Sequence, residues 1–96
     1  MNFFFHESAE SELLSAIEYY ELKQSGLGYR FSKEIYAAIE RICEHPLAWE
    51  SLDGEFRRCL SGRFPYGVIY RIVGNSIQIM AVMHLNREPG YFRERE

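Results

Sequence analysis

Two long apolar runs near the end of the chain constrain its fold more than any other feature. They are "FPYGVIYRIV" (residues 64–73) and "SIQIMAVMH" (residues 76–84), and only Gly74 and Asn75 separate them. A two-residue Gly-Asn link between β-forming runs predicts a tight hairpin. Pairing outward from this turn places Val73 opposite Ser76. The sequence therefore predicts an antiparallel hairpin at the centre of a sheet.

The expected register divides the hairpin into two faces, because successive strand residues point to opposite sides. On the apolar face, which we expect to pack on helices, the pairs are Ile72–Ile77, Tyr70–Ile79, Val68–Ala81 and Tyr66–Met83. On the other face, here called the open face, they are Arg71–Gln78, Ile69–Met80, Gly67–Val82 and Pro65–His84. This register predicts that Arg71 and His84 share the open face, whose mixed character suits a binding surface.

Helical periodicity dominates the first half of the chain. Apolar residues recur at positions 9, 13, 16, 17 and 20 and again at positions 31, 35, 38, 39 and 42. Ser8 is the expected N-cap of the first helix. Gly26 and Gly28 predict a tight break between the helices, and Pro46 ends the second one. So short a connection predicts an antiparallel helical hairpin.

Two further strands complete the expected fold. They are "NFFF" (residues 2–5) and "EFRRCL" (residues 55–60). The element order β-α-α-β-β-β predicts one α+β domain over residues 1–96, an antiparallel sheet with the helical hairpin packed on one face. No apolar run is long enough to span a membrane, and no signal peptide is expected at the start. Two cysteines without a CxxC spacing, Cys43 and Cys59, are expected to be thiols rather than metal ligands.

The charges are distributed unevenly along the chain. Residues 1–55 carry four basic and eleven acidic side chains, whereas residues 56–96 carry seven arginines and three glutamates. Arginine presents a planar fork that suits phosphate or carboxylate, so the second half is suited to an anionic partner. Internal pairing with the acidic first half is the alternative. Arg57 and Arg58 are adjacent in a strand, so one of them must point to the open face.

The ending "MHLNREPGYFRERE" places His84, Arg87 and Tyr91 close together, followed by two more arginines. Catalysis, partner docking and ordinary strand-end contacts all fit such a group. In the structural alternative, Arg87 binds a strand-end carbonyl or a carboxylate of the first helix. Tyr91 would then anchor the tail. No metal site or cofactor is expected, because the histidines are scattered.

The chain resembles the RelE/ParE superfamily, the toxins of bacterial type II toxin–antitoxin pairs. The resemblance covers nearly the whole chain and rests on the element order and on "AIEYYE", "GLGYRF", "FRR", "FPYGVIYRI", "IQIMAVMH" and "HLNREPGYFRER". The ending is typical of plasmid-stabilisation members. The resemblance implies a cytoplasmic toxin that inhibits growth and is neutralised by a cognate antitoxin.

The superfamily is divided by target. ParE-like members block DNA gyrase and replication, and the ending together with the sequence pI of about 5.6 favours this group here. RelE-like members are metal-independent endoribonucleases that cut mRNA on the ribosome. In that case His84 and Tyr91 would be the acid–base groups, with Arg58, Arg71 and Arg87 stabilising the developing charge.

A third alternative is a degenerate toxin that only binds its antitoxin. The open face would receive an amphipathic helix or an added strand of the antitoxin. The expected partner-binding residues are Arg57, Arg58, Arg71, Gln78, Met80 and His84.

Overall fold

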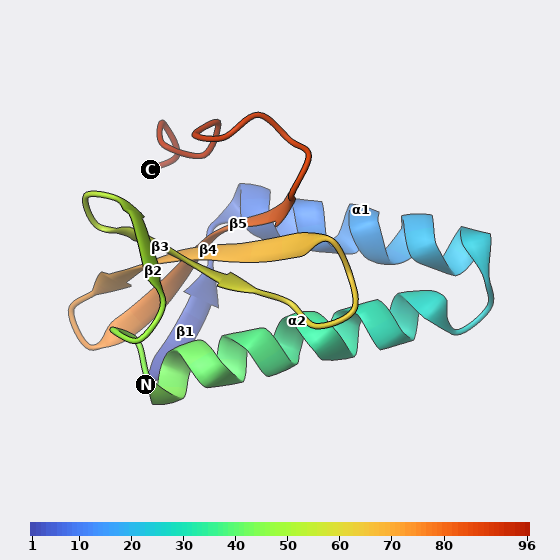
Figure 1. The fold of residues 1–96 in the computed structure, drawn as a ribbon, viewed down its shortest axis with the longest axis horizontal. Coiled ribbons are helices and arrows are strands. Elements are labelled where there is room, and N and C mark those ends of the chain that lie inside the picture. Colours follow the sequence, from blue (N-terminus) through green and yellow to red (C-terminus); the bar gives the residue numbers. More distant parts are fainter.

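A five-stranded sheet packs against a helical hairpin in the computed structural model, which describes residues 1–96 (Figure 1). The elements are β1 (Asn2–Phe5), α1 (Glu7–Lys23), α2 (Leu27–Glu44), β2 (Glu50–Asp53), β3 (Phe56–Leu60), β4 (Tyr66–Val73) and β5 (Ser76–His84). The strand order is β1-β5-β4-β3-β2. The predicted α+β fold is confirmed, with two refinements. The sheet is mixed, because β1 runs parallel to β5, and β2 is an additional short strand.

The two helices lie side by side in an antiparallel pair, as predicted (Figure 1). The N-cap of α1 is His6 rather than the expected Ser8, because His6 Nδ1 accepts a 3.0 Å hydrogen bond from the Ser8 amide. Gly26, with a φ of 88°, precedes α2. Gly28 lies inside α2, and a Cβ there would lie 2.5 Å from the carbonyl oxygen of Ile17. Glycine therefore allows the close approach of the two helices. Neither helix is long and apolar enough to cross a membrane.

The main core lies between the helices and one face of the sheet. The buried residues of both helices meet the inward side chains of β3, β4 and β5, chiefly Cys59, Val68, Tyr70, Ile77, Ile79 and Val82. The Tyr70 hydroxyl donates a 2.6 Å hydrogen bond to the carbonyl oxygen of Pro46. This bond attaches the α2–β2 connection to the centre of the sheet.

The predicted hairpin register is correct only near the turn. The pairs from Val73–Ser76 to Tyr70–Ile79 are observed, but Ile69 then pairs with Ala81, which leaves Met80 as an extra residue in β5. This β-bulge reverses the facing of every later residue of β5. Val82 joins the main core instead of the open face, and His84 pairs with Tyr66. The expectation that Arg71 and His84 share a face is therefore wrong.

The open face is not left uncovered. A second cluster lies on it, comprising Phe56, Ile69, Met80, Ala81, Met83 and Phe92. Phe92 belongs to the C-terminal tail, residues 85–96, which turns back over the sheet after β5 (Figure 1). The ring centroids of Phe92 and Phe56 lie 5.3 Å apart in an edge-to-face arrangement. The tail thus covers an apolar surface that, from the sequence, was expected to bind a partner.

Tyr70 provides a test of the main core through its ionisation. Burial raises the pKa of Tyr70 to about 12 from an ordinary value of 10.0. Because the folded pKa exceeds the unfolded pKa, the contribution of Tyr70 to stability is complete below pH 10.0 and is lost as the pH rises toward about 12. We expect Tyr70→Phe to lower the free energy of unfolding by about 1 kcal/mol near neutral pH. Above pH 10.0 this deficit should shrink or reverse. Urea denaturation of wild type and Tyr70→Phe, near neutral pH and above pH 10.0, measures this deficit. A deficit that does not change with pH would show that the ionisation of Tyr70 is not coupled to folding.

Candidate functional site

The carboxylate of Glu12 on α1 connects three parts of the molecule. Its Oε1 accepts hydrogen bonds from the Val82 amide at 3.1 Å and from Arg95 Nη1 at 2.9 Å. Its Oε2 accepts from the Tyr91 hydroxyl at 2.7 Å and from Arg95 Nη2 at 2.9 Å. Arg87 Nη1 lies 3.4 Å from the same oxygen. We call Glu12, Arg87, Tyr91 and Arg95 the Glu12 cluster.

Arg95 also covers the bulged edge of β5. Its Nη1 donates a 2.8 Å hydrogen bond to the carbonyl oxygen of Met80, the extra residue of the bulge. This part of β5 extends beyond the end of β1, so its outward backbone groups have no strand partner. Glu12 and Arg95 supply the missing acceptor and donor. The tail therefore protects the free edge of β5 as well as its open face.

Tyr91 is held between two arginines. The guanidinium carbons of Arg87 and Arg95 lie 3.6 Å and 4.9 Å from the centroid of its ring. Burial and the hydrogen bond to Glu12 raise the pKa of Tyr91 far above its ordinary value. Its bonds to Glu12 raise the pKa of Arg95 as well. The Tyr91 hydroxyl is therefore a fixed donor to Glu12, which makes it unsuited to act as a base near neutral pH.

The sequence carries a signal for this cluster that lies outside its recognisable motifs. Glu12 lies three residues after Ala9 and four before Ala16, which places a carboxylate beside the buried stripe of α1. A carboxylate in that position requires cationic partners. The arginine-rich tail supplies them through Arg87 and Arg95.

His84 lies in a groove on the helix side of the sheet. Its ring stacks edge-to-face on Tyr66 at 5.2 Å, and its Nδ1 accepts a 3.0 Å hydrogen bond from the Asn86 amide. The groove holds about 420 Å³ between α1 and the end of β5, and its walls are Ser11, Glu12, Ser15, Ala16, Tyr19, Tyr66, Val82, His84 and Arg87.

Arg58 and Arg71 lie on the open face, away from His84. Side chains alternate along β3, and Cys59 is buried on the helix side of the sheet. Arg57 therefore faces the helices, and Arg58 faces away from them. Arg57 donates to the carbonyl oxygen of Trp49 at 2.8 Å. Arg58 pairs with Glu50 at 2.8 Å, and Arg71 with Glu55 at 3.4 Å. Of the two adjacent arginines, Arg58 is thus the one on the open face.

The remaining expected partner-binding residues are mostly covered. Gln78 accepts a 2.9 Å hydrogen bond from Arg71 Nε and is 8% exposed, and Met80 is fully buried. The structure thus brings Arg87 and Tyr91 together in the Glu12 cluster, with His84 in the adjoining groove. Arg58 and Arg71 belong to the opposite face. The five residues considered for RNA cleavage do not surround one common space.

A substitution of Glu12 tests the cluster. In Glu12→Gln the arginines of the tail lose their partly buried counter-charge, so we expect the free energy of unfolding to fall by about 2 kcal/mol. Glu10→Gln, an exposed change on the same helix, is the matched control and should cost less than about 0.5 kcal/mol. Urea denaturation of both variants measures the difference. Equal stabilities would show that the cluster does not hold the tail.

Comparison with known proteins agrees with this architecture. Residues 3–89 match the family model described as "ParE toxin of type II toxin-antitoxin system, parDE". A solved structure titled "Chromosomal ParDE TA system from P. aeruginosa" has the same fold, with a TM-score of 0.68 and 17% identity over 90% of this chain and 97% of that one. No curated protein matches the sequence. Because the family model covers nearly the whole chain, the chain belongs to the ParE toxins of type II toxin–antitoxin systems.

Proposed function

We propose that this toxin inhibits growth in the cytoplasm by blocking DNA gyrase and thus replication. The observation that carries the proposal is the separation of the candidate catalytic residues. His84 lies on the helix side, whereas Arg58 and Arg71 lie on the open face. A protein that blocks an enzyme by binding needs a surface but no acid–base pair. This arrangement favours gyrase over cleavage of mRNA.

The contacts of Tyr91 and Arg87 add support. A nuclease would need a free acid–base group beside uncommitted cations. Tyr91 donates to Glu12 at 2.7 Å, and Arg87 lies 3.4 Å from the same carboxylate. Glu12 thus competes with a phosphate for both groups.

We propose that the uncovered part of the open face takes part in binding the cognate antitoxin as a helix or strand. Arg58 and Arg71 are 27% and 23% exposed, and their carboxylate partners, Glu50 and Glu55, are more exposed than they are. Pairs of this kind exchange readily for the carboxylates of an acidic partner, because surface ion pairs are weak. Leu60 on the same face is exposed and adds apolar area.

The target is tested by inducing the toxin in bacteria without antitoxin and following the incorporation of labelled thymidine and amino acids. Thymidine incorporation should fall first, because gyrase is needed for replication. A first collapse of protein synthesis would instead indicate cleavage of mRNA. If neither falls, the chain only binds antitoxin, and the proposed activity is wrong.

A single substitution separates the two mechanisms further. His84→Gln should leave toxicity unchanged, because the proposed mechanism needs no proton transfer. Growth after induction, compared with wild type at equal protein level, measures this. Loss of toxicity from a folded His84→Gln protein would contradict the binding mechanism.

Charge reversal tests the antitoxin surface. Arg58→Glu combined with Arg71→Glu should weaken binding of the antitoxin at least about tenfold, since like charges would face each other. Lys23→Glu combined with Lys33→Glu changes the charge equally at two exposed helix positions and is the control. Titration calorimetry compares the two double variants. Equal affinities would remove Arg58 and Arg71 from the interface.

A further inference from the structure

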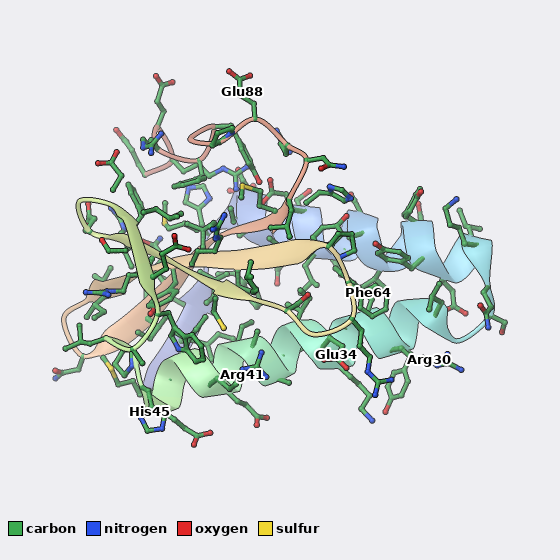
Figure 2. The ribbon with its side chains drawn as sticks, viewed as in Figure 1. Arg30, Glu34, Arg41, His45, Phe64 and Glu88 are labelled. Atoms are coloured by element: carbon green, nitrogen blue, oxygen red, sulfur yellow. The ribbon has the colours of Figure 1, made fainter.

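We propose that a hollow between α2 and the β3–β4 loop binds a phosphate group. We call it the cationic hollow. It holds about 490 Å³ and is lined by Leu27, Arg30, Lys33, Glu34, Arg63 and Phe64. Figure 2 shows Phe64 between the loop and α2, with Glu34 and Arg30 on the helix beside it.

The cations that line the hollow form no hydrogen-bonded ion pair. Arg30 and Lys33 form no ion pair, and they lie three residues apart on α2, on neighbouring positions of one helix face. The only ion pair in the hollow joins Arg63 Nε to Glu34 at 3.8 Å, which is too long for a hydrogen bond. By contrast, the arginines of the sheet and the tail have carboxylate or carbonyl partners within 3.4 Å. The cations of the hollow are thus less tightly paired than the arginines of the sheet and the tail.

The backbone holds Arg63 in place. Arg63 has a φ of 66°, and it is the one non-glycine residue in the left-handed region. Such backbone outliers persist where the surroundings fix them, and they cluster at functional sites. The loop is fixed at Phe64, whose ring packs on those of Tyr20 and Phe31 at 4.9 Å and 5.2 Å.

Hydrogen bonds within the loop add to this fixation. Ser61 donates through its amide to Tyr66 and through its hydroxyl to the carbonyl oxygen of Phe64. The side chain of Arg63 nevertheless remains 85% exposed. Because the backbone of Arg63 is already fixed, less conformational entropy is lost when its guanidinium binds a ligand.

The charge of the hollow matches a phosphate better than a carboxylate. Three cations and one carboxylate give the lining a net charge of +2 in a chain whose net charge is −3. A phosphate monoester carries about −1.5 to −2 charges and three acceptor oxygens, so it can engage all three cations. A carboxylate would leave at least one cation without a partner. Arginine forks also bind phosphate in a bidentate manner.

This site is separate from the surface that we propose for the antitoxin. It lies on the helix side of the molecule, whereas Arg58 and Arg71 lie on the open face. Two sources could supply the phosphate, namely a free phosphate monoester and the backbone of a nucleic acid.

The experiment titrates the isotope-labelled full chain with inorganic phosphate and, separately, with a short DNA duplex, following amide shifts by NMR. We expect phosphate to shift the amides of the β3–β4 loop and the first turns of α2. Arg30→Gln combined with Arg63→Gln should weaken this binding at least about tenfold. Lys23→Gln combined with Arg71→Gln is the charge-matched control outside the hollow and should bind phosphate as wild type does.

Comparing inorganic phosphate with the DNA duplex distinguishes the two sources of the phosphate group. If the duplex shifts the same amides and competes with phosphate, the ligand is a nucleic-acid backbone, and its affinity should fall steeply with salt. If only phosphate binds, the ligand is a monoester. If neither shifts these amides, or if both double variants weaken binding equally, the proposal is overturned.

Discussion

The partly buried carboxylate of Glu12 is the interaction on which the arrangement of this toxin depends. It accepts hydrogen bonds from the Val82 amide, the Tyr91 hydroxyl and both terminal nitrogens of Arg95. A carboxylate that leaves water must be paired and hydrogen-bonded to be tolerated. Glu12 meets this requirement with partners separated from it by 70 to 83 residues in the sequence. One side chain therefore joins α1, the bulged edge of β5 and the C-terminal tail.

The contacts of Glu12 determine which charged side chains remain available to a partner. Arg87, Tyr91 and Arg95 would be a plausible group for acid–base and phosphate chemistry if they were free. Their contacts with Glu12 give them a structural role instead, and Phe92 between them covers the open face. Two groups of cations outside the Glu12 cluster line the surfaces that we propose for binding: Arg58 and Arg71 on the open face, and those of the cationic hollow beside α2. This arrangement supports the proposal that the toxin acts by binding rather than by catalysis.

The predictable parts of the fold are those with local signals. The Gly74–Asn75 turn, the first hairpin pairs and the periodicity of both helices were all correct. The bulge at Met80 could not be seen, because "SIQIMAVMH" is apolar on both faces and its alternation gives no mark where the register shifts. That single residue separated His84 from Arg71. The expected alternative for Arg87, a contact with a carboxylate of the first helix, is confirmed by its approach to Glu12.

The most direct test of the role of Glu12 is native-state hydrogen exchange at the Val82 amide. This amide lies beyond the end of β1, and only Glu12 and the tail separate it from water. We expect this amide to exchange as slowly as the amides paired inside the β4–β5 hairpin, through opening of the whole domain. Rapid exchange, at the rate of an uncovered strand edge, would rule out this role of Glu12. It would show that the tail is not held against α1, and that Arg87 and Tyr91 are not committed to Glu12.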